Sequence, residues 1–349
     1  MRRLLIALVA VTACGTSYAP QANVSPTAAA VSPSSLPSET PAPAPVLGVF
    51  YDGQTQKLEV VDSNGLVITS VDATAPARHN AGLPWISEST TRVYFLDATG
   101  TVHFLALDGT TGIATHVDAA TGQDIGFAVS PDDRKIAVAV LSYRSATSFA
   151  GTRMYVEDLA GGSHHVDIYS SSINAEFPIA WTKGRLVVAL ATPLCCKPDA
   201  LNPYGAVEYH VVDPTSGHRV VTLCHGTVGP IGPPTTVGVN CWGVQLHWDG
   251  TPCCDVGTGA FGILAPDGNS SAWGSPIEVA YGFSLSGQIF VTTTPGTVAG
   301  WLDVGYLIYR EPGDLALYIG VAPELRQTVR VQGSGSATLW EGTLPTAIS

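Results

Sequence analysis

The sequence predicts an all-β protein, a β-propeller in which six sheets form a ring, and three observations lead to this prediction. Charged residues make up only 13% of the 349 residues, while glycine (37) and proline (25) are plentiful, which suits short strands joined by tight turns. No long segment has the apolar spacing of an amphipathic helix. From Leu47 onward, a pattern of strand, turn and strand recurs roughly every 40–50 residues, a period typical of propellers with four strands per unit.

The repeated unit is plainest in its third copy. There Phe127-Ala128-Val129-Ser130-Pro131-Asp132-Asp133-Arg134-Lys135-Ile136-Ala137-Val138 joins two apolar strands through a polar turn. This run resembles the core of WD-like propeller repeats, as in the periplasmic propeller of the Tol system and its relatives. The resemblance covers roughly residues 47–343. It implies a propeller that works outside the cytoplasm.

Other copies of the unit contain the same two halves. Strands of the first half are expected at Arg92–Leu96, Arg185–Leu190 and Gln288–Val291, and strands of the second half at His103–Asp108, Met154–Asp158, Glu208–Asp213, Phe261–Leu264 and Tyr306–Arg310. Several second-half strands run into turns that contain glycine, as hairpins require. The pattern therefore predicts successive antiparallel sheets along the chain.

The first unit lacks one strand, because nothing suitable precedes Leu47. We expect a strand from the C-terminal region, Thr328–Gln332 or Ala337–Glu341, to complete the first sheet and so close the ring. Closure of this kind removes the open edges of the first and last sheets. This count gives six blades, and a degenerate unit after Ala322 would make seven.

The N-terminal segment predicts export and lipidation. Arg2 and Arg3 precede the apolar run Leu4–Val11, which is too short to span a bilayer and suits a signal peptide. The run Val11-Thr12-Ala13-Cys14 resembles a bacterial lipobox, which implies that Cys14 is lipidated. An ordinary signal peptide and a buried apolar start are the alternatives.

The predicted organisation has three parts: a lipoprotein signal peptide at residues 1–13, a tether at residues 14–46 and the propeller at residues 47–345. Residues 16–45 contain seven prolines and one charged residue, Glu39, so this segment cannot fold by itself. We expect a membrane-anchored monomer in the cell envelope. The net charge of −12 makes nucleic acid an unsuitable partner, because an acidic surface repels phosphates.

Six further cysteines suggest disulfides on one face of the ring. Two rare Cys-Cys pairs, Cys195-Cys196 and Cys253-Cys254, each follow a Thr-Pro sequence. Aligning the fourth and fifth units places both pairs between the second and third strands of neighbouring blades. Cys224 is expected at the end of the fourth blade's outermost strand, and Cys241 in the fifth blade's innermost strand. All six would lie near one face, and exported chains meet an oxidising environment.

The pairing of these cysteines is open. Bridges between adjacent blades are one arrangement. In a second, each Cys-Cys pair closes on itself and a Cys224–Cys241 bond staples the connection between blades. A zinc site is the third, since His225 and His247 are near.

The same face is the predicted binding surface. Long connections between second and third strands are expected at Tyr143–Gly151, Thr192–Gly205, Asp249–Gly259 and Thr294–Asp303. Loops borne on a rigid scaffold often carry binding. The candidate binding residues on this rim are Tyr143, Arg144, Phe149, Tyr204 and Trp301. The alternative interpretation is that these loops became long by sequence drift, without selection for binding.

No catalytic, cofactor or metal residues are assigned. The sequence has no GxSxG, HExxH or phosphate-binding loop, and His164, His165, His210 and His218 are expected to be solvated. The leading hypothesis is a non-catalytic module that binds an envelope protein or glycan. The alternative is a propeller enzyme, a hydrolase or quinoprotein-type oxidoreductase, with a site in the central channel, because Asp108–Gly112 and Asp213–Gly217 resemble turns of quinoprotein repeats. A structural lipoprotein without a specific ligand is the third possibility.

Overall fold

The computed structural model of the protein describes the chain from residue 47 to residue 343, with gaps. The described residues are 47–79, 82–145, 148–192, 202–227, 231–252, 262–268, 270–274, 277–280, 292–303, 305–314, 316–322, 325–332 and 338–343. All of them belong to the compact unit Ala44–Ser349. They form strands and turns without a helix, so this part of the chain holds no helix long and apolar enough to cross a bilayer.

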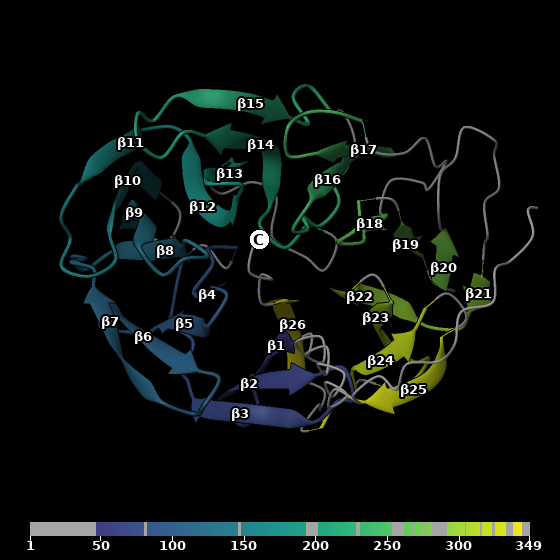
Figure 1. Cartoon of the computed structure of the whole chain (residues 1–349). Coiled ribbons are helices and arrows are strands. Elements are labelled where there is room, and N and C mark those ends of the chain that lie inside the picture. Colours follow the sequence, from purple (N-terminus) through teal and green to yellow (C-terminus); the bar gives the residue numbers. More distant parts are fainter. Residues whose placement is uncertain are drawn as a thin grey trace, which may run out of the picture. The chain divides into compact units, whose positions relative to one another are not determined.

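The described strands pair into antiparallel sheets, which we number I to VII around the ring (Figure 1). Sheet I contains β26 (Thr338–Thr343), β1 (Leu47–Asp52), β2 (Lys57–Asp62) and β3 (Val67–Asp72). Sheet II contains β4 (Ile86–Glu88), β5 (Arg92–Leu96), β6 (Thr101–Ala106) and β7 (Thr111–His116). Sheet III contains β8 (Gln123–Val129), β9 (Lys135–Ser145), β10 (Ser148–Asp158) and β11 (Val166–Ser171).

The remaining sheets follow in chain order. Sheet IV contains β12 (Ala175–Thr182), β13 (Arg185–Ala191), β14 (Ala206–Val212) and β15 (Arg219–Leu223). Sheet V has only β16 (Gly238–Cys241) and β17 (Val244–His247). Sheet VI contains β18 (Ile263–Leu264), β19 (Ser271–Trp273), β20 (Ile277–Ala280) and β21 (Thr292–Thr294). Sheet VII contains β22 (Thr297–Asp303), β23 (Tyr306–Arg310), β24 (Tyr318–Val321) and β25 (Arg326–Arg330).

The sheets follow one another around a centre, which makes the protein a β-propeller. The first strands of the four-stranded sheets contact each other around the ring: β26 contacts β4, β4 contacts β8, β8 contacts β12, β18 contacts β22, and β22 contacts β26. In sheet V, β16 contacts β18. These strands lie nearest the centre of the ring in Figure 1. The predicted all-β propeller is therefore confirmed.

The C-terminal strand closes the ring, as the sequence predicts. Strand β26 pairs antiparallel with β1, with Tyr51 opposite Leu339 and Asp52 opposite Thr338. The last strand of the chain thus becomes the first strand of sheet I (Figure 1). This pairing supplies hydrogen-bond partners for the inner edge of β1, which would otherwise be an open edge.

Apolar packing between neighbouring sheets forms four clusters of buried residues. One cluster joins sheets I, II and III, including Val60, Phe95 and Phe127. A second joins sheets III, IV and V, a third joins sheets VI and VII, and a fourth joins sheet VII to sheet I. A sheet that packs on a neighbour at each face has strands that are more continuously apolar than those of a sheet with one wet face.

Two tryptophans, the half-buried Trp181 and the buried Trp301, add hydrogen bonds between adjacent first strands. The indole nitrogen of Trp181 in β12 donates to the carbonyl of Ala128 in β8, at 3.2 Å. The indole nitrogen of Trp301 in β22 donates to the carbonyl of Ile263 in β18, at 2.9 Å. Each bond joins a sheet to the preceding one and satisfies a polar group that packing has removed from water.

Turn chemistry follows the aspartate-and-glycine pattern of the sequence. Between β2 and β3, the Oδ1 atom of Asp62 accepts hydrogen bonds from the backbone nitrogens of Asn64 and Leu66, at 2.9 and 3.0 Å. Gly65 has a φ of +74°, and a Cβ there would lie 2.8 Å from the carbonyl oxygen of Arg330. Glycine is therefore required both by this turn and by the close approach of sheet VII.

The strand assignments of the later units are wrong in part. Phe261–Leu264 was expected as a second-half strand, but Ile263 and Leu264 form the first strand of sheet VI. Thr294–Asp303 is not a long loop between second and third strands, because it contains the crossover from β21 to β22 and the whole of β22. The segment Gln288–Val291 lies outside the described residues. The very short strands of sheets V and VI show too little alternation for their positions to be predicted correctly.

Glu59 is a buried carboxyl group in the middle of sheet I. It lies in β2 between Phe50 and Ser70 and is 8% exposed. Its Oε2 atom has no hydrogen-bond partner within the described structure. Burial raises the pKa of Glu59, the nearby Asp52 charge raises it further, and Lys57 acts in the opposite direction. The ionised form is therefore disfavoured in the folded protein.

We expect Glu59→Gln to stabilise the protein at neutral pH by about 1 kcal/mol, because it removes a buried charge that lacks a full set of partners. A carboxyl group whose pKa is raised by folding favours the folded state only while it is protonated. The advantage of the variant should therefore appear as the pH rises through the folded-state pKa and vanish in acid. Urea unfolding between pH 4 and 8 measures this difference. Asp118→Asn, at a fully exposed side chain, is the control, and equal stabilities of wild type and Glu59→Gln at every pH would contradict the expectation.

Candidate binding face

One face of the ring collects the connections expected to carry binding. In each four-stranded antiparallel sheet, the connection between second and third strands leaves from the same end as the crossover to the next sheet. We call this side the crossover face. Over sheets III to V its described residues include the end of the β9–β10 hairpin, residues 192 and 202–205 from the connection between β13 and β14, and crossover residues 172–174, 224–227 and 231–237.

The β9–β10 hairpin brings three predicted rim residues to this face. Tyr143 and Phe149 are half-buried, with ring centroids 5.7 Å apart, and Arg144 is exposed. His79, from the crossover between sheets I and II, stacks on Tyr143 at 4.6 Å. The Nδ1 atom of His79 lies 2.9 Å from a carboxylate oxygen of Asp124. The hairpin end is therefore fixed to a neighbouring crossover, and only Arg144 reaches fully into solvent.

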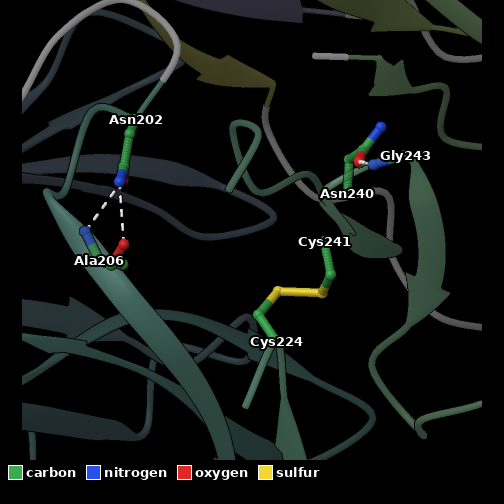
Figure 2. Close-up of a disulfide and its surroundings, with 6 residues drawn as sticks. All are labelled: Asn202, Ala206, Cys224, Asn240, Cys241 and Gly243. Carbon is green, nitrogen blue, oxygen red and sulfur yellow. Dashed lines mark hydrogen bonds between the residues drawn. A yellow bond between two sulfur atoms is a disulfide. The ribbon is translucent and has the colours of Figure 1, made fainter. Parts of the chain in front are cut away.

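Tyr204 lies at the described end of the connection between β13 and β14. The amide side chain of Asn202 bonds both backbone groups of Ala206, at 2.9 Å each, and so closes this end of the loop (Figure 2). The Tyr204 ring is half-buried and lies 6.3 Å from the ring of Phe177. Tyr204 is on the predicted face, with part of its ring available to a partner.

The structure contradicts the assignment of Trp301 to the rim. Trp301 lies in the first strand of sheet VII, is 5% exposed and uses its indole nitrogen in the bond to Ile263. A side chain buried between two sheets cannot contact a partner. The sequence Ala299-Gly300-Trp301 looked like a loop because its small residues lack the alternation of a strand.

Cys224 and Cys241 form a disulfide across the crossover between sheets IV and V (Figure 2). Cys224 follows the outermost strand of sheet IV, as predicted, and Cys241 ends β16. Both residues are buried. The bond closes the connection between the two sheets, which is the pairing in one of the arrangements left open by the sequence. Cys195, Cys196, Cys253 and Cys254 lie outside the described residues.

Sheet V is small but has four antiparallel segments. Isolated bridges pair Ile231 with Cys241 and Leu246 with Pro252, on either side of the β16–β17 pair. The turn between the second and third segments is therefore Trp242-Gly243, beside the disulfide. The described part of Asp249–Gly259, up to Pro252, follows the third segment. From the sequence, both Cys-Cys pairs, with the Thr-Pro before each, were expected between second and third strands. For Thr251-Pro252 this is wrong, because these residues follow the third segment of sheet V.

The Trp242-Gly243 turn exposes an aromatic side chain that the sequence analysis missed. Trp242 is 55% exposed and has a φ of +54°, and Gly243 follows with a φ of +85°. The side chain of Asn240 accepts a 2.7 Å hydrogen bond from the backbone nitrogen of Gly243 (Figure 2). A tryptophan with positive φ is a costly conformation that only a well-held turn maintains. The sequence signal that could have indicated this turn is the pair Trp242-Gly243 directly after Cys241.

Three other exposed apolar residues lie near this turn. Ile173, in the crossover from sheet III to sheet IV, is 74% exposed, and Val207, at the start of β14, is 37% exposed. Val244, which begins β17, is 53% exposed. The other large apolar residues that are exposed in the described structure, Leu66, Ile68, Ile113 and Val220, are spread over the outer strands of three sheets. The crossover face at sheets IV and V thus has a concentration of apolar surface.

A network of charged groups with three buried members, Glu176, Glu208 and His210, lies in sheet IV. His210 is fully buried, with Nε2 2.5 Å from Oε1 of Glu208 and Nδ1 3.5 Å from Oε2 of Glu176. His225 contacts the other oxygen of Glu208 at 2.6 Å, and Arg219 contacts Glu176 at 3.1 Å. The expectation that His210 is solvated is wrong, because β14 turns this side chain into the interior.

The network favours the ionised form of Glu208. Burial acts to raise the pKa of Glu208, but hydrogen bonds from His210 and His225 outweigh burial and lower the pKa below its usual value. Glu176 and Glu208 are both buried. Their charges are therefore compensated by groups on β14, β15 and the crossover, and these residues are structural rather than displayed to solvent. In the described residues, no group of three or more His, Cys, Asp or Glu side chains is arranged to hold a metal ion.

The turns that resemble quinoprotein repeats lie at the opposite ends of their sheets. Asp108 accepts a hydrogen bond from the backbone nitrogen of Thr110, and Asp213 accepts one from that of Thr215, at 2.9 Å each. These turns join third to fourth strands, β6 to β7 and β14 to β15. His164, at the corresponding turn of sheet III, is exposed, as predicted. Turn formation accounts for the Asp-x-x-Thr-Gly pattern.

Comparisons with known proteins show no matching family. No family model matches the sequence, and no curated protein matches it. Among solved structures, a functionally unknown protein from Desulfotomaculum acetoxidans is 10% identical, with a TM-score of 0.49 over 87% of this chain and 99% of that one. Dihydro-heme d1 dehydrogenase NirN is 14% identical, with a TM-score of 0.45 over 85% of this chain and 66% of that one.

The β-propeller domain of the trilobed protease from Pyrococcus furiosus is 13% identical, with a TM-score of 0.39 over 68% of this chain and 80% of that one. At these sequence identities and TM-scores, the similarities to solved structures carry no argument about function. The assignment as a propeller rests on the ring of sheets and its closing strand.

We expect replacement of both Cys224 and Cys241 by alanine to lower the free energy of unfolding by about 3 kcal/mol, because the bond closes a loop of moderate length in the unfolded chain. Denaturant unfolding of the oxidised proteins measures the loss. Replacing both residues avoids a free thiol, and Thr222→Ala, on the exposed side of β15, is the control. Peptide mapping without reductant should recover the segments around Cys224 and Cys241 as one linked species, and their separate recovery would contradict the pairing.

Proposed function

We propose that the protein is a membrane-tethered, extracytoplasmic β-propeller that binds an envelope protein or glycan without catalysing a reaction, through its crossover face. The observation that carries this proposal is the group of exposed apolar side chains on sheets IV and V, with Trp242 at its centre. Exposed apolar patches on a soluble domain mark interaction sites more often than single exposed residues do.

The rigidity of this region supports binding. The disulfide, the Asn240–Gly243 bond and the Asn202–Ala206 bonds hold the connections that carry the apolar residues. A surface that is already ordered loses little conformational entropy when a partner docks. Tyr143, Arg144, Phe149 and Tyr204 extend the same face over sheets III and IV.

We further propose that each of the seven sheets is one blade, so that the ring has seven blades rather than six. The additional blade comes from the middle of the chain, where residues 231–252 form sheet V and residues 263–294 form sheet VI. It does not come from the C-terminal tail, where the sequence left room for a degenerate unit.

The N-terminal segment supports the tethered location. A basic pair, an apolar run and small residues before Cys14 stand in the order of a lipoprotein signal, and the proline-rich residues 16–45 provide a spacer. The resemblance of the repeats to the Tol-system propeller agrees with a place in the cell envelope. We propose that the chain acts there as a monomer.

Site-specific photocrosslinking in intact cells tests the binding face. We expect a benzoyl-phenylalanine introduced at Ile173 or Trp242 to form adducts with a partner, because these side chains project into solvent on the crossover face. The same group at Ile113 or Val220, which are exposed on outer strands, is the matched control. The proposed face would be overturned if no adducts formed at any of the four positions. It would also be overturned if adducts were as abundant at the control positions as at Ile173 and Trp242.

Cys14→Ala tests the anchor. We expect the variant to leave the membrane fraction, because the lipid that holds the mature chain can no longer be attached. Fractionation followed by immunoblotting measures the change, and Cys224→Ala, which leaves the lipobox intact, is the control. Retention of the Cys14→Ala protein in membranes, with its signal segment cleaved as in wild type, would contradict lipidation.

A further inference from the structure

Four exposed apolar residues of the crossover face together make up what we call the Trp242 patch: Ile173, Val207, Trp242 and Val244. Ile173 lies in the crossover from sheet III to sheet IV, and covalent and polar links connect the other three. Val207 precedes Glu208, which contacts His225, and His225 follows Cys224, which is bonded to Cys241 beside Trp242. Val244 lies opposite Cys241 in the β16–β17 pair. The patch therefore spans the seam between the two sheets.

The chemistry of the patch favours a polypeptide over a carbohydrate. Three of its four side chains are aliphatic, and they offer neither hydrogen bonds nor an aromatic plane for a sugar ring. Their exposed fractions of 37–74% leave apolar surface that only apolar groups of a partner can cover favourably. Trp242 supplies the large, rigid anchor that is typical of protein interfaces.

The charges around the patch indicate which polypeptide fits. The protein carries a net charge of −12, yet the described carboxylates next to the patch, Glu176 and Glu208, are both buried and paired. Among the described residues of this sector, the exposed charged or titratable groups are Arg144 on the β9–β10 hairpin, His225 in the crossover after β15, and Arg219, which contacts Glu176. Described exposed carboxylates of the crossover face, such as Asp72 and Asp118, belong to sheet I and to the crossover after sheet II. The described part of this sector is therefore neutral to positive within an acidic protein.

We propose that the Trp242 patch binds a polypeptide segment that combines apolar side chains with Asp or Glu residues. Apolar anchors of the partner cover Trp242 and its aliphatic neighbours, and its carboxylates lie toward Arg144 and His225. Basic segments are drawn instead to the exposed carboxylates of sheets I and II. This inference rests on the proposed binding face and adds the class of partner.

Selection from a random peptide library displayed on phage tests the inference. The probe is a library of 16-residue peptides, selected on the immobilised full chain and counter-selected on Trp242→Asn. Asparagine keeps the turn because it accepts a positive φ, and matching thermal unfolding of the two proteins verifies this. We expect the selected peptides to be enriched in apolar residues and in Asp or Glu.

A selected peptide, made synthetically and labelled, then gives affinities by fluorescence anisotropy. Trp242→Asn and Ile173→Ser should each weaken binding at least about tenfold, as expected for anchors. Arg144→Glu should weaken it about threefold or more, and raising salt should weaken the wild-type complex. Ile113→Ser, outside the patch, should bind as wild type does.

Peptides without enrichment in carboxylates, or affinities unchanged by Trp242→Asn and Ile173→Ser, overturn the inference. So does selective retention of neutral oligosaccharides by wild type but not by Trp242→Asn, since the patch then recognises a glycan. Crosslinking at Ile173 and Trp242 in cells is scored separately. If adducts form at these positions but the peptide selection fails, the proposed binding face still stands. Only the proposed class of partner is then wrong.

Discussion

The pairing of β26 with β1 is the constraint on which the rest of the structure depends. It joins the two ends of the described chain in one sheet and supplies hydrogen-bond partners for the inner edge of β1. Because β26 also contacts β22, an unclosed ring would expose the apolar faces of sheets I and VII together. Phe50, Val61, Ile308 and Ile319, which form the cluster between these sheets, are buried only because the ring is closed.

Within the closed ring, sheet V has the fewest strand residues among the described sheets. Sheet V has two four-residue strands and two single-residue bridges, a small number of hydrogen bonds for an independent sheet. The Cys224–Cys241 bond ties it to the outer strand of sheet IV, and Trp248 packs on Tyr209 while donating to the carbonyl of Thr235. These links compensate for the short strands. They also explain why a tryptophan with positive φ is maintained at the β16–β17 turn.

Much of the fold could be predicted from the sequence, because long strands keep their alternation. The third unit, with β9 and β10 of 11 residues each, was recognised, but these strands extend into Tyr143–Gly151, which was expected to be a long connection. The closing strand is the second of the two expected segments, Ala337–Glu341. The other errors lie where strands have two to four residues, since periodicity needs more positions to be recognised. Trp301 and His210 were misplaced for a different reason. Whether a residue of a strand faces a neighbouring sheet depends on the register and on the sheets around it, which one sequence does not contain.

The position of the candidate binding face could be predicted from the sequence, but its surface charge pattern could not. Topology alone puts the long connections on one side of the ring, so Tyr143, Arg144, Phe149 and Tyr204 could be assigned to it. The charge pattern of that side depends on which carboxylates are buried. Glu176 and Glu208 count as two negative charges in the sequence, yet both are buried and paired, with the buried His210 and with the exposed Arg219 and His225. Burial of a charged group is tolerated only with such partners. The network thus pairs two carboxylates that the sequence alone would count as negative surface charge in a protein of net charge −12.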